Sequence, residues 1–175
     1  MNETQKKFCS KMTNWFLFKA YAIQKLPLAF LTGFKIVELD ESKCVTRVKY
    51  RYLNKNPFRS TFWAVLGMAA ELSTGAYALL ATKGKEESIA VILIDNHAEF
   101  VKKATGVTTF TCSNWLAFEK AVGRAIETGE PQTATGRSIG ANSKGETIAL
   151  FEFTWSFKIR DQPKSSPSSS RKLCF

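Results

Sequence analysis

Hydrophobic and polar residues alternate most regularly near the end of the chain, between residues 146 and 160. A period of two is typical of a β-strand with one buried and one solvated face. A similar run at 133–141 precedes it, and Asn142-Ser143-Lys144-Gly145 predicts the turn of a hairpin between them. We therefore predict a long central strand, whose buried face consists of Thr147, Ala149, Phe151, Phe153, Trp155, Phe157 and Ile159.

Shorter alternating runs predict further strands earlier in the chain. The first two are separated by Asp40-Glu41-Ser42, which has the composition of a turn. Residues 113–128 instead place apolar side chains at helical spacing, so we predict a helix there. The predicted strands of this part are 34–40, 43–53, 88–94, 98–103 and 107–112.

The segment from Thr61 to Thr82 is apolar around its whole circumference and contains one charged residue, Glu71. As a helix it is about long enough to cross ~30 Å of hydrocarbon. Small and polar residues dilute its hydrophobicity, however, and a central glutamate is costly in lipid unless it is paired. We therefore predict a core helix, capped by Ser60 or Thr61, and no transmembrane segment.

These elements together predict an α+β protein in which a curved antiparallel sheet wraps around one long apolar helix. Ahead of the sheet, residues 14–31 predict short amphipathic helices that are broken near Pro27. We expect a helical extension at 1–33 and one domain at 34–161. Residues 162–175 are rich in proline and serine and predict a disordered tail.

Charge and the scarcity of reactive side chains limit the chemistry. The chain of 175 residues has 25 Lys and Arg against 15 Asp and Glu, and its net charge of +10 favours nucleic acid, phosphate-bearing molecules or an acidic membrane surface. No recognised nucleic-acid motif accompanies this charge, so we expect no specific nucleic-acid partner. The single histidine, His97, excludes multi-histidine metal sites, and we expect no metal. The four scattered cysteines suggest reduced thiols in a cytoplasmic protein.

The loop and the acid of the apolar helix carry a family resemblance. Asn56-Pro57 lies six residues ahead of the helix that contains Glu71. With this order of elements, residues 34–160 resemble the hotdog-fold thioesterase superfamily, and more narrowly the PaaI-like acyl-CoA thioesterases and their DUF4442-type relatives. That family typically has Asn-Pro, a Gly, His-Gly-Gly and then the acid. This chain departs from it with Arg59 at the Gly position and Phe62-Trp63-Ala64 in place of His-Gly-Gly.

The resemblance implies a set of catalytic residues. Backbone amides at the start of the helix, that of Ala64 among them, would stabilise an oxyanion, because the first turn of a helix has unpaired N–H groups. Glu71 would be unusually basic in apolar surroundings and would activate a water or attack directly. Ser73 or Thr74 would orient that water, and Asn56 would polarise the substrate carbonyl or brace the loop.

Each candidate also has a simpler structural interpretation. Glu71 fits a hydrogen-bonded helix residue at a dimer interface, and Asn56 fits a turn residue ahead of Pro57. His97 fits an ordinary residue at a strand end. The aromatic side chains of residues 146–160 fit a core as well as an acyl tunnel.

The resemblance implies an acyl thioester as the substrate and no separate cofactor, since the coenzyme A moiety would be part of an acyl-CoA. Lys102, Lys103 and Arg137 would attract its phosphates. A homodimer or a dimer of dimers is implied too, because the family's pocket forms between two helix ends and two sheets. The replacement of His-Gly-Gly favours the alternative of a non-catalytic protein that binds an acyl group or acyl-CoA.

Overall fold

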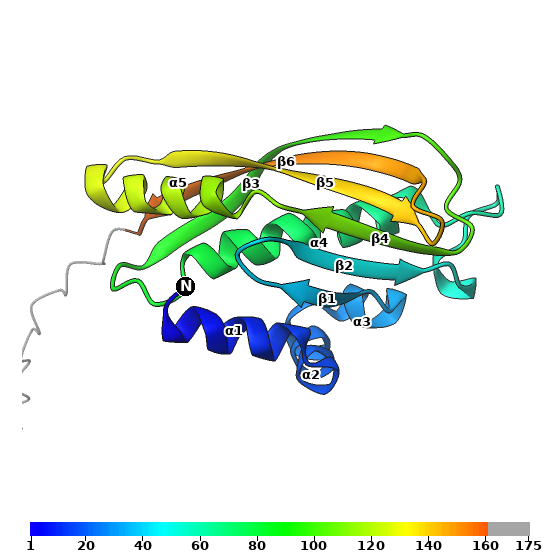
Figure 1. The fold of residues 1–175 in the computed structure, drawn as a ribbon, viewed down its shortest axis with the longest axis horizontal. Coiled ribbons are helices and arrows are strands. Elements are labelled where there is room, and N and C mark those ends of the chain that lie inside the picture. Colours follow the sequence, from blue (N-terminus) through cyan, green and yellow to red (C-terminus); the bar gives the residue numbers. More distant parts are fainter. Residues whose placement is uncertain (161–175) are drawn as a thin grey trace, which may run out of the picture.

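A computed structural model describes residues 1–160, and the predicted tail at 162–175 lies outside the described residues. Three helices come first, and strands alternate with helices after them (Figure 1). The elements are α1 Glu3–Thr13, α2 Trp15–Lys25, α3 Pro27–Thr32, β1 Lys35–Leu39, β2 Cys44–Lys49, the 3-10 helix η1 Tyr52–Asn54, α4 Trp63–Ala81, β3 Ile89–Phe100, β4 Val107–Cys112, α5 Trp115–Thr128, β5 Gln132–Asn142 and β6 Thr147–Ile159.

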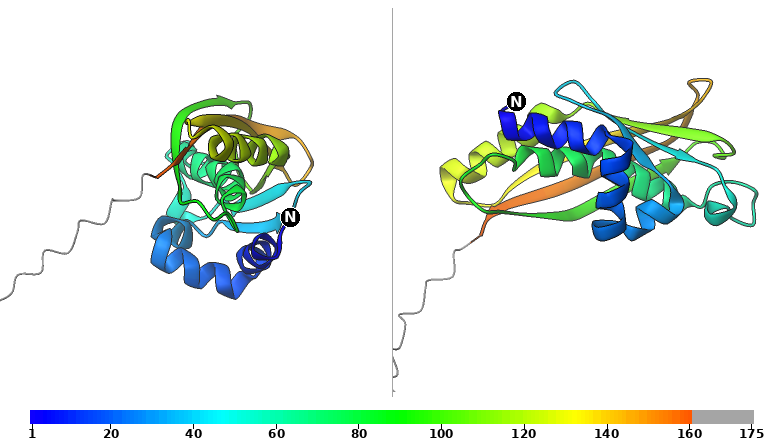
Figure 2. Two further views of the ribbon diagram at one scale, coloured as in Figure 1. Left: turned by 90° about the vertical axis from the view of Figure 1, so that its left-hand side faces the viewer. Right: turned by 90° about the horizontal axis from the view of Figure 1, so that it is seen from below.

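The six strands form one antiparallel sheet in the order β1-β2-β4-β5-β6-β3, and this sheet curves around α4 (Figure 2). Strand β6 lies between β5 and β3, as predicted for the alternating run near the end of the chain. Phe151, Phe153 and Phe157 on its inner face are buried in the core. The architecture is the predicted α+β hotdog fold with added N-terminal helices.

Helix α4 is held in the concave side of the sheet by packing and by polar contacts. Thr46 of β2 donates a hydrogen bond to the carbonyl of Ala69 at 2.6 Å, and Ser73 bonds to Ser138 of β5 at 2.8 Å. Within residues 1–160, α4 is the one helix that is long and apolar enough to cross a membrane, and 72% of that stretch is buried inside the protein. It serves as the core helix that its pattern predicts.

The structure corrects two predictions near the sheet edge and the start of α4. The two strands predicted at 88–94 and 98–103 are one strand, β3, with an irregularity between Leu93 and Asp95. Polar residues interrupt its apolar pattern because this edge of the sheet faces solvent. Neither Ser60 nor Thr61 caps α4: Phe62 occupies the cap position and makes no side-chain cap. The hydroxyls of the two candidates bond within the loop and to the carbonyl of Ala104 instead.

The N-terminal segment contains one more helix than its hydrophobic pattern indicates. Residues 3–13 form α1, which begins at a capping box between Asn2 and Gln5. Pro27 begins α3, which confirms the predicted break, and Gly33 ends α3 in the left-handed conformation with φ 70°. Helices α1 to α3 lie outside the sheet, next to β1 and to the part of α4 that the sheet leaves open (Figure 2).

Candidate functional site

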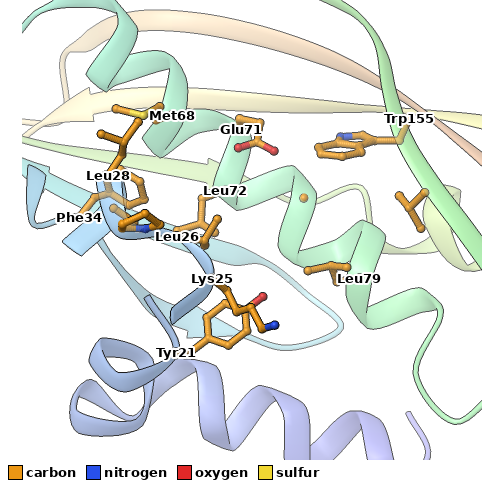
Figure 3. Close-up of a pocket in the computed structure, with 14 residues that line it drawn as sticks. Tyr21, Lys25, Leu26, Leu28, Phe34, Met68, Glu71, Leu72, Leu79 and Trp155 are labelled. Atoms are coloured by element: carbon orange, nitrogen blue, oxygen red, sulfur yellow. The ribbon is translucent and has the colours of Figure 1, made fainter. Parts of the chain in front are cut away.

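One side of α4 faces a cavity instead of the sheet. Met68, Glu71, Leu72, Gly75 and Leu79 follow one another at helical spacing and share this side. The cavity has a volume of about 440 Å³ and lies between α4, β3 and the junction of α2 with α3 (Figure 3). Its remaining walls come from Tyr21, Lys25, Leu26, Pro27, Leu28, Ala29, Phe34, Val91 and Trp155. The lining is therefore apolar apart from a carboxylate, an amine and a phenol.

Glu71 supplies the carboxylate of this cavity. Its side chain is half-buried, and burial raises the pKa of the carboxyl above its ordinary value. Within residues 1–160, no ion pair engages it. The carboxylate lies near the indole of Trp155 (Figure 3), since a Cβ added at Gly75 would be 3.2 Å both from Glu71 Oε1 and from the Trp155 ring. A poorly solvated carboxylate without a partner is a stronger base than one in water.

Thr74 lies on a different side of α4 and is fully buried. Its Oγ1 donates to the carbonyl of Glu71 at 3.0 Å and accepts from Nε1 of Trp155 at 3.1 Å. These bonds hold the Trp155 ring in place as a wall of the cavity, and Thr74 itself does not line the cavity. A role of Thr74 in orienting a water stays a prediction.

A second cleft, of about 370 Å³, lies where the loop ahead of α4 meets the residues after β3. In this loop Asn56 Oδ1 accepts hydrogen bonds from the amides of Phe58 and Ser60 at 3.0 and 3.1 Å, and from the Ser60 hydroxyl at 3.2 Å. Arg59 adopts the left-handed conformation, with φ 59°, at the position where the thioesterases that the chain resembles have Gly. The loop thus has a backbone turn that suits glycine although its residue is arginine.

Trp63, the first residue of α4, lines this cleft. Within residues 1–160, no hydrogen bond engages the backbone N–H groups of Trp63 and Ala64, so both can bind an acceptor. Glu71 comes eight positions after Trp63, which corresponds to about 12 Å along the helix axis. In one chain, the acid and the helix start therefore belong to different cavities.

The structure brings together two of the three predicted phosphate-binding residues. Lys102 and Lys103 line the second cleft with the loop of Asn56, whereas Arg137 lies apart on β5. Lys102 Nζ is 2.6 Å from Glu146 Oε1, and this hydrogen bond holds the pKa of Glu146 below its ordinary value. Arg137 Nε is 3.9 Å from Glu152 Oε1. All three cations are accessible to solvent.

Other chemically capable residues lie away from both cavities. His97 is exposed on β3, opposite Glu152 of β6, and lines neither cavity. No group of three metal-binding side chains occurs among residues 1–160. Tyr21 and Lys25 also line the cavity of Glu71, although no motif in the sequence marks either of them. The helix break at Pro27 was visible in the sequence, but nothing local indicated that the break faces α4.

Comparisons with solved structures find the same fold at low sequence identity. No protein-family model matches the chain, and no curated protein matches it significantly in sequence. A probable thioesterase from Pseudomonas aeruginosa superposes with a TM-score of 0.69 and 16% identity over 86% of this chain and 99% of its own. A putative thioesterase from Shewanella oneidensis gives a TM-score of 0.70 and 10% identity over 87% of this chain and 99% of its own. A thioesterase from Haemophilus influenzae gives a TM-score of 0.62 and 13% identity over 83% of this chain and 91% of its own. The chain therefore has the fold of the hotdog thioesterases.

Proposed function

We propose that this chain hydrolyses an acyl thioester whose acyl group occupies the cavity of Glu71. The observation that carries the proposal is the half-buried carboxylate, which no ion pair engages within residues 1–160, in a mostly apolar cavity of about 440 Å³. This volume lies in the range of small-molecule sites. The similarity in fold to thioesterases gives further support, because it comes from an independent comparison.

The proposed reaction uses Glu71 as a general base. Its carboxylate takes a proton from a water while the water oxygen bonds to the thioester carbon. The carbonyl oxygen becomes an oxyanion, which accepts hydrogen bonds from free amides such as that of Ala64. When the tetrahedral intermediate collapses, the carbon–sulfur bond breaks and the proton passes from Glu71 to the thiolate. The products are a carboxylic acid and a thiol, and no separate cofactor takes part.

A second copy of the chain completes this site in our proposal. Glu71 and the start of α4 lie too far apart within one chain to act on one thioester, so the amides would come from a partner. Strand β3 favours such pairing because it is a long edge strand that exposes Ile92 and Ile94. We therefore propose a homodimer, or a dimer of dimers.

The proposed substrate is an acyl-CoA. Lys102 and Lys103 lie beside the loop that leads to α4, where they would attract the phosphates of the coenzyme A moiety. Arg137 would contribute only if the partner brings its strand near the same cleft. A cytoplasmic location fits this substrate and remains part of the proposal.

Free-thiol release from short, long and aryl acyl-CoAs tests the reaction, with Glu71→Gln as the main variant. Glutamine keeps the shape of the side chain but is not a base, so kcat should fall at least about a hundredfold. The matched control is Glu127→Gln, on the exposed side of α5, which should leave kcat unchanged. Equal rates for wild type and Glu71→Gln would refute the role of Glu71.

Mixed dimers test the shared site. Ala64→Pro removes one amide N–H in the first turn of α4, where proline is tolerated. A dimer of two Ala64→Pro chains and a dimer of two Glu71→Gln chains should both be inactive. Random mixing of the two chains should restore about a quarter of the wild-type rate, because half of the dimers would have one intact site of two. No recovery in chains shown to exchange would contradict a shared site.

A second candidate function is binding of acyl-CoA without turnover. It is favoured by Trp63, whose exposed side chain stands at the helix start where the related motif has glycine. A bulky side chain there restricts the approach of a thioester to the amides. Thermal stabilisation by acyl-CoA without thiol release from any substrate would support this function.

A further inference from the structure

The N-terminal helices present an unusual number of apolar side chains to solvent. Phe16 and Ile23 are 80% and 55% exposed, and they share the side of α2 that lies opposite the buried Phe18 and Ala22. Helix α3 buries only Ala29 and Thr32. We call the exposed set the apolar arm surface, and it consists of Trp15, Phe16, Leu17, Ile23, Leu28, Phe30 and Leu31.

Lysines are interspersed with this apolar arm surface. Residues 1–35 contain six lysines and one acid, Glu3. The amines of Lys19 and Lys35 lie 4.7 and 5.3 Å from the centre of the Trp15 ring. Within residues 1–160, no ion pair engages Lys19 or Lys25. The surface therefore combines exposed aromatic and aliphatic groups with positive charge that exceeds the negative charge of residues 1–35.

We propose that the apolar arm surface binds the surface of an anionic lipid bilayer. The apolar side chains would enter the boundary between headgroups and acyl chains, while the lysines would contact the negative headgroups. A second copy of this chain is a poorer occupant on electrostatic grounds. A two-fold interface would place the surface against itself and bring the lysines of both copies together.

Membrane binding would also position the cavity of Glu71. Tyr21 and Lys25 of α2 and Leu28 of α3 line that cavity from the same two helices that carry the apolar arm surface. In Figure 2, α2 and α3 lie along one outer side of the molecule, next to the open side of α4. A bound arm would thus hold the cavity mouth at the lipid surface. Only this consequence rests on the proposed thioesterase function.

Co-sedimentation of the full chain with vesicles tests the proposal. The vesicles would be phosphatidylcholine alone or phosphatidylcholine with about one-third phosphatidylglycerol. We expect at least about tenfold tighter binding to the anionic vesicles at low salt, and weaker binding as salt screens the lysines. Equal binding to both kinds of vesicle, or binding to neither, would overturn the proposal.

Matched variants separate the arm from the general positive charge of the chain. Phe16→Ser with Ile23→Ser, and separately Lys19→Glu, should each weaken binding to the anionic vesicles at least about tenfold. The controls Leu116→Ser and Lys120→Glu change exposed residues of α5 and should leave binding unchanged. If Lys120→Glu weakens binding as much as Lys19→Glu, general charge explains the binding. If Leu116→Ser weakens it as much as the double serine variant, the apolar side chains of the arm have no special role. If the arm variants lower the oligomeric mass and vesicles bind no form, the occupant is a second copy.

Discussion

The cavity of Glu71 and the cleft of Asn56 lie along the same helix, but their polar groups differ in whether they have bonding partners. In the cavity, the Glu71 carboxylate has apolar neighbours and no ion-pair partner within residues 1–160. In the cleft, Asn56 Oδ1 accepts three hydrogen bonds and Lys102 pairs with Glu146. A satisfied polar group stabilises local structure, whereas a buried unpaired group costs stability and is available for chemistry. Removing the charged or hydrogen-bonding group should therefore raise the free energy of unfolding in the cavity and lower it in the cleft.

The largest effect is expected from filling the cavity. Gly75→Leu projects a side chain toward Glu71 and Trp155, where even a Cβ would lie at 3.2 Å. It should weaken the binding of an acyl-CoA analogue about a hundredfold, because the acyl group loses its space. Isothermal titration measures the change. Gly123→Leu on α5 is the control, since nothing lies within 4 Å of a Cβ added there. Undiminished binding to Gly75→Leu would place the ligand elsewhere.

In the cleft, removing a polar group should cost stability. Two amides and one hydroxyl donate hydrogen bonds to Asn56 Oδ1, and Asn56→Ala removes their acceptor. We expect a loss of about 2 kcal/mol in the free energy of unfolding, measured with urea. Asn56→Asp retains an acceptor and should recover most of that loss. If Asn56→Ala is as stable as wild type, the loop does not depend on this side chain.

In the cavity, Glu71→Gln should raise stability at neutral pH, by less than Asn56→Ala lowers it. Burial raises the pKa of Glu71 in the folded state, so the folded protein binds the proton more tightly than the unfolded chain. Wild-type stability then falls as pH rises from the ordinary carboxyl range through the raised pKa, whereas glutamine does not titrate. Urea unfolding across acid to neutral pH should show the two proteins converging at low pH. A constant difference at every pH would contradict the raised pKa.

The smallest effect concerns the loop backbone. Arg59 has φ 59°, and Arg59→Gly should relieve about 1 kcal/mol of left-handed strain. Greater freedom of the unfolded chain offsets part of this gain, so we expect a net increase of about 0.5 kcal/mol. Thermal unfolding compares it with Arg59→Ala, which keeps the strain and should not gain. A loss of stability in Arg59→Gly would show that the arginine side chain contributes more than its backbone costs.

The sequence predicted the sheet and the core helix well because their signals are local. Alternation in residues 146–160 specifies which face of β6 is buried, and the uniform apolarity around Glu71 specifies a central helix. The cavity could not be predicted in this way. It forms where Tyr21 and Lys25 meet a side of α4 some fifty residues later, and that meeting depends on how α2 and α3 pack. The continuity of β3 was missed because its polar residues face solvent at an edge.

The docking of α1 onto α4 has a consequence for synthesis. Gln5 near the start of the chain donates a hydrogen bond to the carbonyl of Leu80, 75 residues later, at 3.3 Å. At about 5 to 20 residues per second, a ribosome needs roughly 4 to 15 s to make the intervening chain. During that time α1 and the apolar helices α2 and α3 have no helix α4 to pack against. A lipid surface or a chaperone can therefore reach the exposed apolar side chains of α2 and α3 before the domain is complete.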